Sequence, residues 1–203
     1  DFKHKESRDE RLGIVEEVMG DYPVDGFELN LNSMPYFFHP NEVENGRQIM
    51  TDWIGRVHGV VKRNRSEKEL VVRIPDRFKD CLAAGLDPEE WVRQGIVDVI
   101  VPEAVGATLM VKSMADYRAF TELVKGTNCR IHGPVHSFVS SDRLADAPLS
   151  MIRAIACNQW AQGVDGLYVA EWFNNWPYQS SFYEKLRELP YPEIMAAKDK
   201  FYY

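Results

Sequence analysis

The sequence predicts an α/β fold of the TIM (β/α)8-barrel type, and three observations support this prediction. Five short runs of apolar and β-branched residues recur at nearly even spacing. Amphipathic stretches of helical length separate these runs, which is typical of parallel strands joined by helical crossovers. No run is followed by the glycine-rich turn of a dinucleotide-binding sheet, so an open doubly wound sheet is the structural alternative rather than the first expectation. Because eight strands normally need about 250 residues, we expect a partial barrel.

Composition indicates one globular domain over residues 1–203, since 45% of the residues are hydrophobic and 27% are charged. The net charge of −7 argues against a nucleic-acid partner, which needs clustered cations. No apolar run approaches the roughly 18 residues of a membrane span, and cellular localisation is not predicted. The three cysteines, Cys81, Cys129 and Cys157, are too far apart for a disulfide framework or a zinc site, so we expect three buried thiols. We also expect no metal and no cofactor.

The expected elements follow in order along the chain. A helix over 8–19 ends where Gly20 follows as a stop signal. A helix opens at Asp87 and Pro88, an N-cap followed by proline at the first helical position. The other expected helices cover 46–63, 113–125 and 149–162. The expected strands cover 24–29, 69–74, 97–101, 129–132 and 164–169.

The first expected strand has one polar and one apolar face. Glu28, Asn30 and Asn32 share one parity, while the positions between them are phenylalanine or leucine. We expect the polar face to look into a barrel mouth, where a carboxylate and amides need partners or substrate. An edge strand with one solvated face is the alternative. An aromatic-rich loop over 34–40 follows the strand and resembles a wall for sugar stacking.

The next two strands carry charged residues near their ends. Arg73 lies within an apolar run, so it needs a partner such as Glu28 or a substrate group, although a structural ion pair explains it equally well. Asp76 follows in the loop. Glu103 stands where the third strand meets its loop, and catalysis and surface solvation are equally good explanations of it.

The last two strands supply histidines, a carboxylate and tryptophans. His132 and His136 are four residues apart, but the Gly-Pro between them breaks helical geometry, so hydrogen bonding to substrate is favoured over metal ligation. Glu171 and Trp172 follow the last strand, with Trp176 beyond. An acid and flat apolar faces suit a sugar subsite, although packing under the next helix explains the tryptophans equally well.

The order of these phrases resembles a group of uncharacterised bacterial glycoside-hydrolase-like (β/α)8-barrel proteins, the family 10-like hydrolase group. The resemblance rests on residues 25–30, 49–51, 72–75, 85–91, 95–98, 163–168, 182–188 and 198–202. It implies that the five strands are the fourth to eighth of a barrel, with three strands upstream and a further domain or chain completing it. The chain departs from the group at Asn30, where the group often has aspartate, and at Glu171, where it often has asparagine.

The leading hypothesis is a glycoside hydrolase that acts on an oligo- or polysaccharide with a carboxylate pair. The expected catalytic residues are Glu28, Glu103 and Glu171. The expected substrate-binding residues are Asn30, Asn32, Arg73, Asp76, His132, His136 and Trp172. A sugar-binding or scaffold barrel without catalysis is the alternative, which Asn30 favours. A barrel aldolase or isomerase is disfavoured, because no expected strand contains a lysine.

Overall fold

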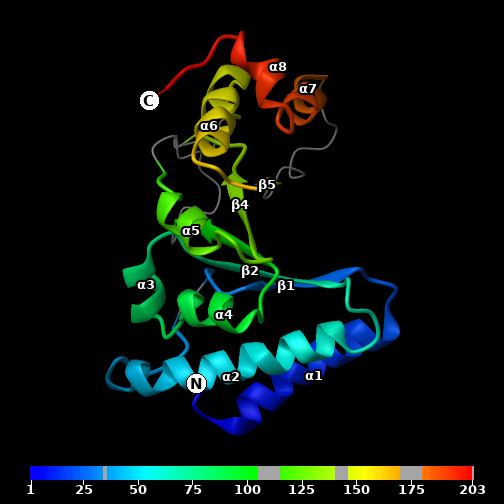
Figure 1. The fold of residues 1–203 in the computed structure, drawn as a ribbon, viewed down its shortest axis with the longest axis vertical. Helices are drawn as coiled ribbons and strands as arrows, with labels where there is room; N and C mark the ends of the chain where they lie inside the picture. The colour runs from blue at the N-terminus through cyan, green and yellow to red at the C-terminus, as the bar shows by residue number, and fades with distance from the viewer. Residues whose placement is uncertain (34–35, 105–114, 140–145, 170–179, 203) are drawn as a thin grey trace.

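The structure is a computed structural model that describes residues 1–33, 36–104, 115–139, 146–169 and 180–202 (Figure 1). Strands and helices alternate along the described chain. In order they are α1 (Lys5–Asp21), β1 (Gly26–Asn30), the 3₁₀ turn η1 (Pro40–Glu42), α2 (Val43–Lys62), β2 (Glu69–Pro75), α3 (Phe78–Ala83), α4 (Pro88–Gln94), β3 (Val99–Glu103), α5 (Arg118–Leu123), β4 (Arg130–Val135), α6 (Leu149–Ala161), β5 (Gly166–Val169), α7 (Ser180–Glu188) and α8 (Pro192–Ala196).

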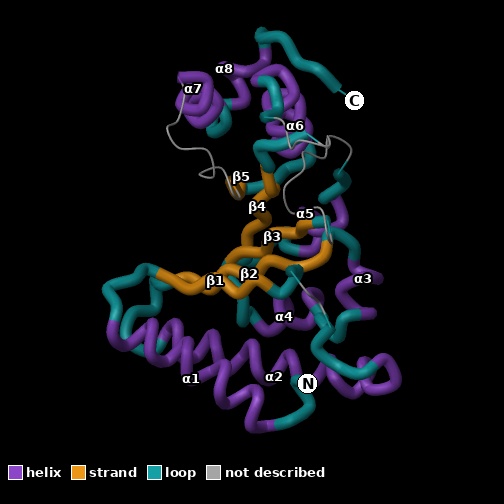
Figure 2. Tube along the Cα trace, turned by 180° about the vertical axis from the view of Figure 1, so that it is seen from behind, coloured by secondary structure: helices purple, strands orange, loops and turns teal. Residues whose placement is uncertain are grey.

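The five strands form one parallel sheet in the order β1-β2-β3-β4-β5 (Figure 2). In the described chain β1 and β5 are opposite edges of the sheet and do not pair with each other. The prediction of a TIM-type barrel segment covering strands four to eight is therefore corrected to an open, five-stranded α/β half-barrel sheet. Local patterns predicted sequential parallel strands, but closure depends on pairing between the first and last strands, which no local pattern encodes. The sequential order also lacks the reversal that a doubly wound sheet requires.

β1, β3 and β5 begin two residues later than predicted, whereas β2 begins at Glu69 as predicted and β4 begins one residue late. The aspartates before β3 and β5 each cap the neighbouring strand. The side chain of Asp98 accepts a hydrogen bond from the backbone N–H of Leu70 at 2.7 Å. Asp165 accepts one from Ile131 at 2.9 Å. In both cases the aspartate of the recurring Val-Asp pair links the strand that follows it to the preceding strand of the sheet. β3 and β5 accordingly start at Val99 and Gly166.

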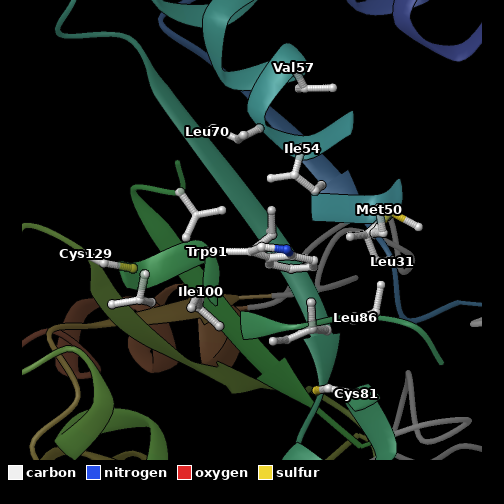
Figure 3. Packing of buried hydrophobic residues seen from close by; sticks show 14 of the residues in the cluster. Leu31, Met50, Ile54, Val57, Leu70, Cys81, Leu86, Trp91, Ile100 and Cys129 are labelled. Carbon is white, nitrogen blue, oxygen red and sulfur yellow. The ribbon is translucent and has the colours of Figure 1, made fainter. Parts of the chain in front are cut away.

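The main core lies between the helices and one face of β1–β4. Leu70, Val72 and Ile74 alternate along β2 and are fully buried, and Trp91 of α4 packs beneath the sheet (Figure 3). The indole N–H of Trp91 donates to the hydroxyl of Thr51 on α2 at 3.0 Å. This contact joins α4 to α2 on the helix-covered face of the sheet.

The predicted helices are confirmed with shifted ends. Asp87 caps α4 by accepting from the backbone N–H of Glu90 at 3.1 Å, and Gly95 ends it in the left-handed conformation at φ 67°. The helix expected over 113–125 is shorter, because α5 begins at Arg118. The short helices α3 and α8 were not predicted, since six and five residues show no clear helical period.

The predicted buried thiols are confirmed for Cys81 and Cys129, whereas Cys157 is only partly buried. Burial raises the pKa of Cys129 to about 12 and raises the pKa of Cys81 further. All three are free thiols. In the described ranges, none of the helices has both the length and the apolar character needed to cross a bilayer.

A second apolar cluster packs α6 and α8 against β4, and a buried ion pair flanks it. The carboxylate of Glu188, whose side chain is 7% exposed, accepts from Arg153 at 2.6 Å and pairs with Lys198. The hydrogen bond from Arg153 is the main cause that lowers the pKa of Glu188 to about 2, with Lys198 adding to it against the opposing effect of burial.

We expect this pair to make the protein sensitive to acid. The folded-state pKa of Glu188 lies below its ordinary value of 4.5, so its stabilisation is present above pH 4.5 and is lost as the pH falls toward 2. The difference in unfolding free energy between the wild type and Glu188→Gln should therefore shrink over this window, as measured by urea denaturation. Glu17→Gln, an exposed change on α1, is the control. A constant difference from pH 6 to 2 would contradict this account.

Candidate functional site on the polar face of the sheet

The face of the sheet that the helices do not cover carries a group of polar side chains. They alternate with the core residues along each strand, as the period of two requires. We call this group the polar-face cluster: Glu28 of β1, Asn32 just after it, Arg73 of β2, Glu103 of β3, His136 just after β4 and Tyr168 of β5.

Glu103 is the buried centre of the cluster, with 1% of its side chain exposed. Nε2 of His136 lies 2.9 Å from one carboxylate oxygen, and a guanidinium nitrogen of Arg73 lies 3.6 Å from the other. The side-chain amide of Asn32 donates to the backbone oxygen of Glu103 at 3.1 Å and to its carboxylate at 3.3 Å. Burial by itself raises the pKa of Glu103, but His136, Arg73 and Asn32 outweigh burial and hold this pKa below its ordinary value. Glu103 is therefore ionised at neutral pH.

Glu28 is the accessible carboxylate, with 34% of its side chain exposed. Its two oxygens accept from the hydroxyl of Tyr168 at 3.0 and 2.9 Å, and Nε of Arg73 lies 3.3 Å away. The guanidinium carbon of Arg73 lies 5.3 Å from the centre of the Tyr168 ring, within cation–π range. Burial, and then the charge of Glu28, raise the pKa of Tyr168 to about 12. The hydroxyl thus stays protonated and holds Glu28 in place.

The hydrogen bond from Tyr168 to Glu28 spans the hollow of the sheet. Tyr168 belongs to β5 and Glu28 to β1, the two strands at opposite edges. Arg73 lies between the two carboxylates and contacts both of them. Residues from the first and last strands therefore meet across one polar face, although about 140 positions separate them in the sequence.

Five predicted site residues come together here: Glu28, Asn32, Arg73, Glu103 and His136. The prediction that Arg73 needs a charged partner is confirmed, because two carboxylates contact it. Asn30 lies beside the cluster and has a local role. Its side-chain oxygen accepts from the backbone N–H of Asn32 at 3.0 Å and of Ser33 at 3.2 Å, which shapes the turn after β1.

Two other predicted residues, Asp76 and His132, are half-buried. Asp76 is half-buried in the loop after β2, and its charge adds to the burial that raises the pKa of Tyr117. His132 is half-buried against Gly166, where an added Cβ would come within 2.8 Å of the imidazole. Burial, and then the charge of Arg130, lower the pKa of His132, so its ring is neutral at pH 7. Glu171 and Trp172 lie outside the described residues.

Tyr168 is the cluster member that sequence reasoning missed. It shares a parity with Gly166 and not with Leu167 or Val169, which pack in the core. A tyrosine on the polar parity of a strand is the signal that would have identified it. Its partner on β1 has no signature in the sequence.

The chemistry available to the cluster is that of one accessible carboxylate backed by donors. Glu28 can accept a hydrogen bond from a hydroxyl, act as a base or attack an electrophilic carbon. Glu103 is ionised and enclosed, so it serves as the anion that positions Arg73 and His136. Among the described residues, no three histidine, cysteine or acidic side chains lie close enough together to hold a metal ion. A purely structural ion-pair network is the competing explanation of the same contacts.

A scan against models of known protein families found no match to this chain. A search of curated proteins likewise found no match.

Proposed function

We propose that the polar face binds a carbohydrate and that the protein is a glycoside hydrolase in which Glu28 is the carboxylate that meets the substrate. The observation that carries this proposal is the setting of Glu28, which is partly exposed while Tyr168 and Arg73 hold both of its oxygens. A fixed carboxylate of this kind suits the nucleophile or base of a glycosidase, whose geometry must be set before the sugar arrives.

Glycoside hydrolysis also needs a proton donor, and the lowered pKa of Glu103 argues against Glu103 in that role. We therefore assign Glu103 as a positioning residue that holds Arg73 beside Glu28. Glu171, the third expected carboxylate, is our proposed proton donor. It stands two residues after the end of β5 in the sequence, and β5 carries Tyr168.

A sugar-binding protein without catalysis is the second proposal, and one observation favours it. Glu28 and Glu103 share Arg73, and the three donors around Glu103 keep it ionised, so this pair as it stands lacks an acid. Arg73 and Glu28 would then bind sugar hydroxyls, because a guanidinium donates hydrogen bonds to them and a carboxylate accepts hydrogen bonds from them.

The test uses the full chain and a panel of xylo-, cello- and manno-oligosaccharides. Release of reducing ends, together with binding heat measured by calorimetry, supports the hydrolase. Binding heat without release of reducing ends supports the sugar-binding alternative. If no glycan in the panel gives binding or release, the carbohydrate proposal is wrong and the cluster is a structural network.

A further inference from the structure

The outer edge of β1 carries backbone groups that no described strand pairs. Glu69 donates its N–H to the oxygen of Asp25 at 3.1 Å, and Leu31 donates to the oxygen of Arg73 at 2.8 Å. In a parallel ladder, every second residue turns its N–H and C=O groups to the same side, so the even positions of β1 face away from β2. Gly26, Glu28 and Asn30 thus point theirs outward, where β1 ends the order of the sheet. Such an edge is a template for another strand.

An apolar cavity of about 450 Å³ lies beside this edge, on the face of the sheet that the helices cover. Phe27 and Leu29 of β1 line one wall, and Ile14 of α1 lines another. Ile14 is 47% exposed and therefore accessible to a partner at this wall of the cavity. Figure 2 shows α1 running beneath β1 at this end of the sheet. Arg11 also lines the cavity and makes no ion pair with a described residue.

We infer that this edge takes an extended peptide segment as an added strand, with apolar side chains at alternate positions and a carboxylate at one end. Its backbone would satisfy the outward groups of Gly26, Glu28 and Asn30. Its apolar side chains would fill the cavity, since alternate residues of a strand point to one face. Its carboxylate would pair with Arg11, which supplies the charge complementarity.

A second copy of this chain fits the same surface less well. A two-fold contact brings the same patch of both copies together, and Glu10, Glu17 and Asp21 are exposed on α1 beside Ile14. Like charges would then face one another across the contact. The inference does not depend on the proposed function, because the cavity and the polar-face cluster lie on opposite faces of the sheet.

The experiment measures amide hydrogen exchange by NMR in the full chain with a synthetic probe, acetyl-Thr-Val-Thr-Ile-Thr-Val-Asp-amide. With the probe at ten times its dissociation constant, exchange at Gly26, Glu28 and Asn30 should slow about tenfold. The amides of Phe27 and Leu29, which already face β2, should change less. The control peptide acetyl-Val-Val-Ile-Thr-Thr-Thr-Asp-amide has the same composition without alternation, and it should give no slowing.

Two variants test the side chains that line the cavity. Ile14→Asp should abolish the slowing, whereas Ile194→Asp should retain it, because Ile194 is similarly exposed at 45% but lies on α8. Arg11→Glu should weaken binding of the aspartate-ended peptide and favour one that ends in lysine. The inference is overturned if the probe at about 1 mM leaves the three amides unchanged. It is also overturned if the control peptide acts equally, or if sedimentation shows that the chain alone dimerises and protects these amides.

Discussion

Glu28→Gln is expected to reduce glycan hydrolysis by about a thousandfold, within the range that general acid–base groups contribute. Glutamine keeps the size of the side chain but loses the charge that a nucleophile or base needs. Glu103→Gln should reduce turnover much less, because Glu103 is 1% exposed and acts through Arg73. The measurement is the initial rate of reducing-end release on an oligosaccharide that the wild type cleaves.

The matched control is Glu17→Gln, an exposed glutamate on α1 away from the polar face, which should keep the wild-type rate. A Glu28→Gln protein that folds, binds and hydrolyses as the wild type does would show that Glu28 is not the reacting carboxylate. If the wild type binds a glycan without hydrolysing it, and Glu28→Gln loses that binding, the result supports the sugar-binding alternative.

Arg73→Met is expected to lower the unfolding free energy by about 3 to 5 kcal/mol, the usual cost of removing one partner of a buried ion pair. Arg73 is 13% exposed and contacts both carboxylates, so its loss leaves Glu103 with His136 and Asn32 as its remaining described partners. Methionine retains the apolar stem and so limits the loss to the charge. Urea denaturation at pH 7 measures the change.

The double variant Arg73→Met/Glu103→Gln separates the ion pair from simple packing. Removing both charges should cost less than the sum of the two single changes, because the neutral amide no longer needs a buried cation. If the two costs add without interaction, the contact at 3.6 Å contributes nothing to stability and Arg73 serves Glu28 alone.

The order and type of the elements could be predicted from local patterns. Apolar residues at helical spacing identified α2, and the cap at Asp87 with the glycine at Gly95 identified α4. The alternation along β1 also separated Glu28 from Phe27 and Leu29 before any contact was known. Each of these signals lies within a single helix or strand, so it can be recognised without tertiary information.

The arrangement around the candidate site could be predicted only in part. The sequence predicted that Arg73, the lone arginine of β2, needs a partner, because a charge within an apolar run is costly to bury unpaired. Which partner Arg73 takes depends on the strand register. The pairing of Pro75 with Glu103 places that glutamate of β3 next to β2. Tyr168 was missed because its partner lies on the far edge of the sheet.

Local patterns predicted a parallel α/β chain with one polar strand face, since strand period, helix period and capping are local properties. Three features emerged from the folded chain alone: the sheet is an open half-barrel, Glu103 is enclosed and Glu28 remains accessible. These outcomes depend on strand pairing and on contacts between residues up to about 140 positions apart. Burial and charge pairing of this kind arise from packing the whole chain, and no short segment encodes them.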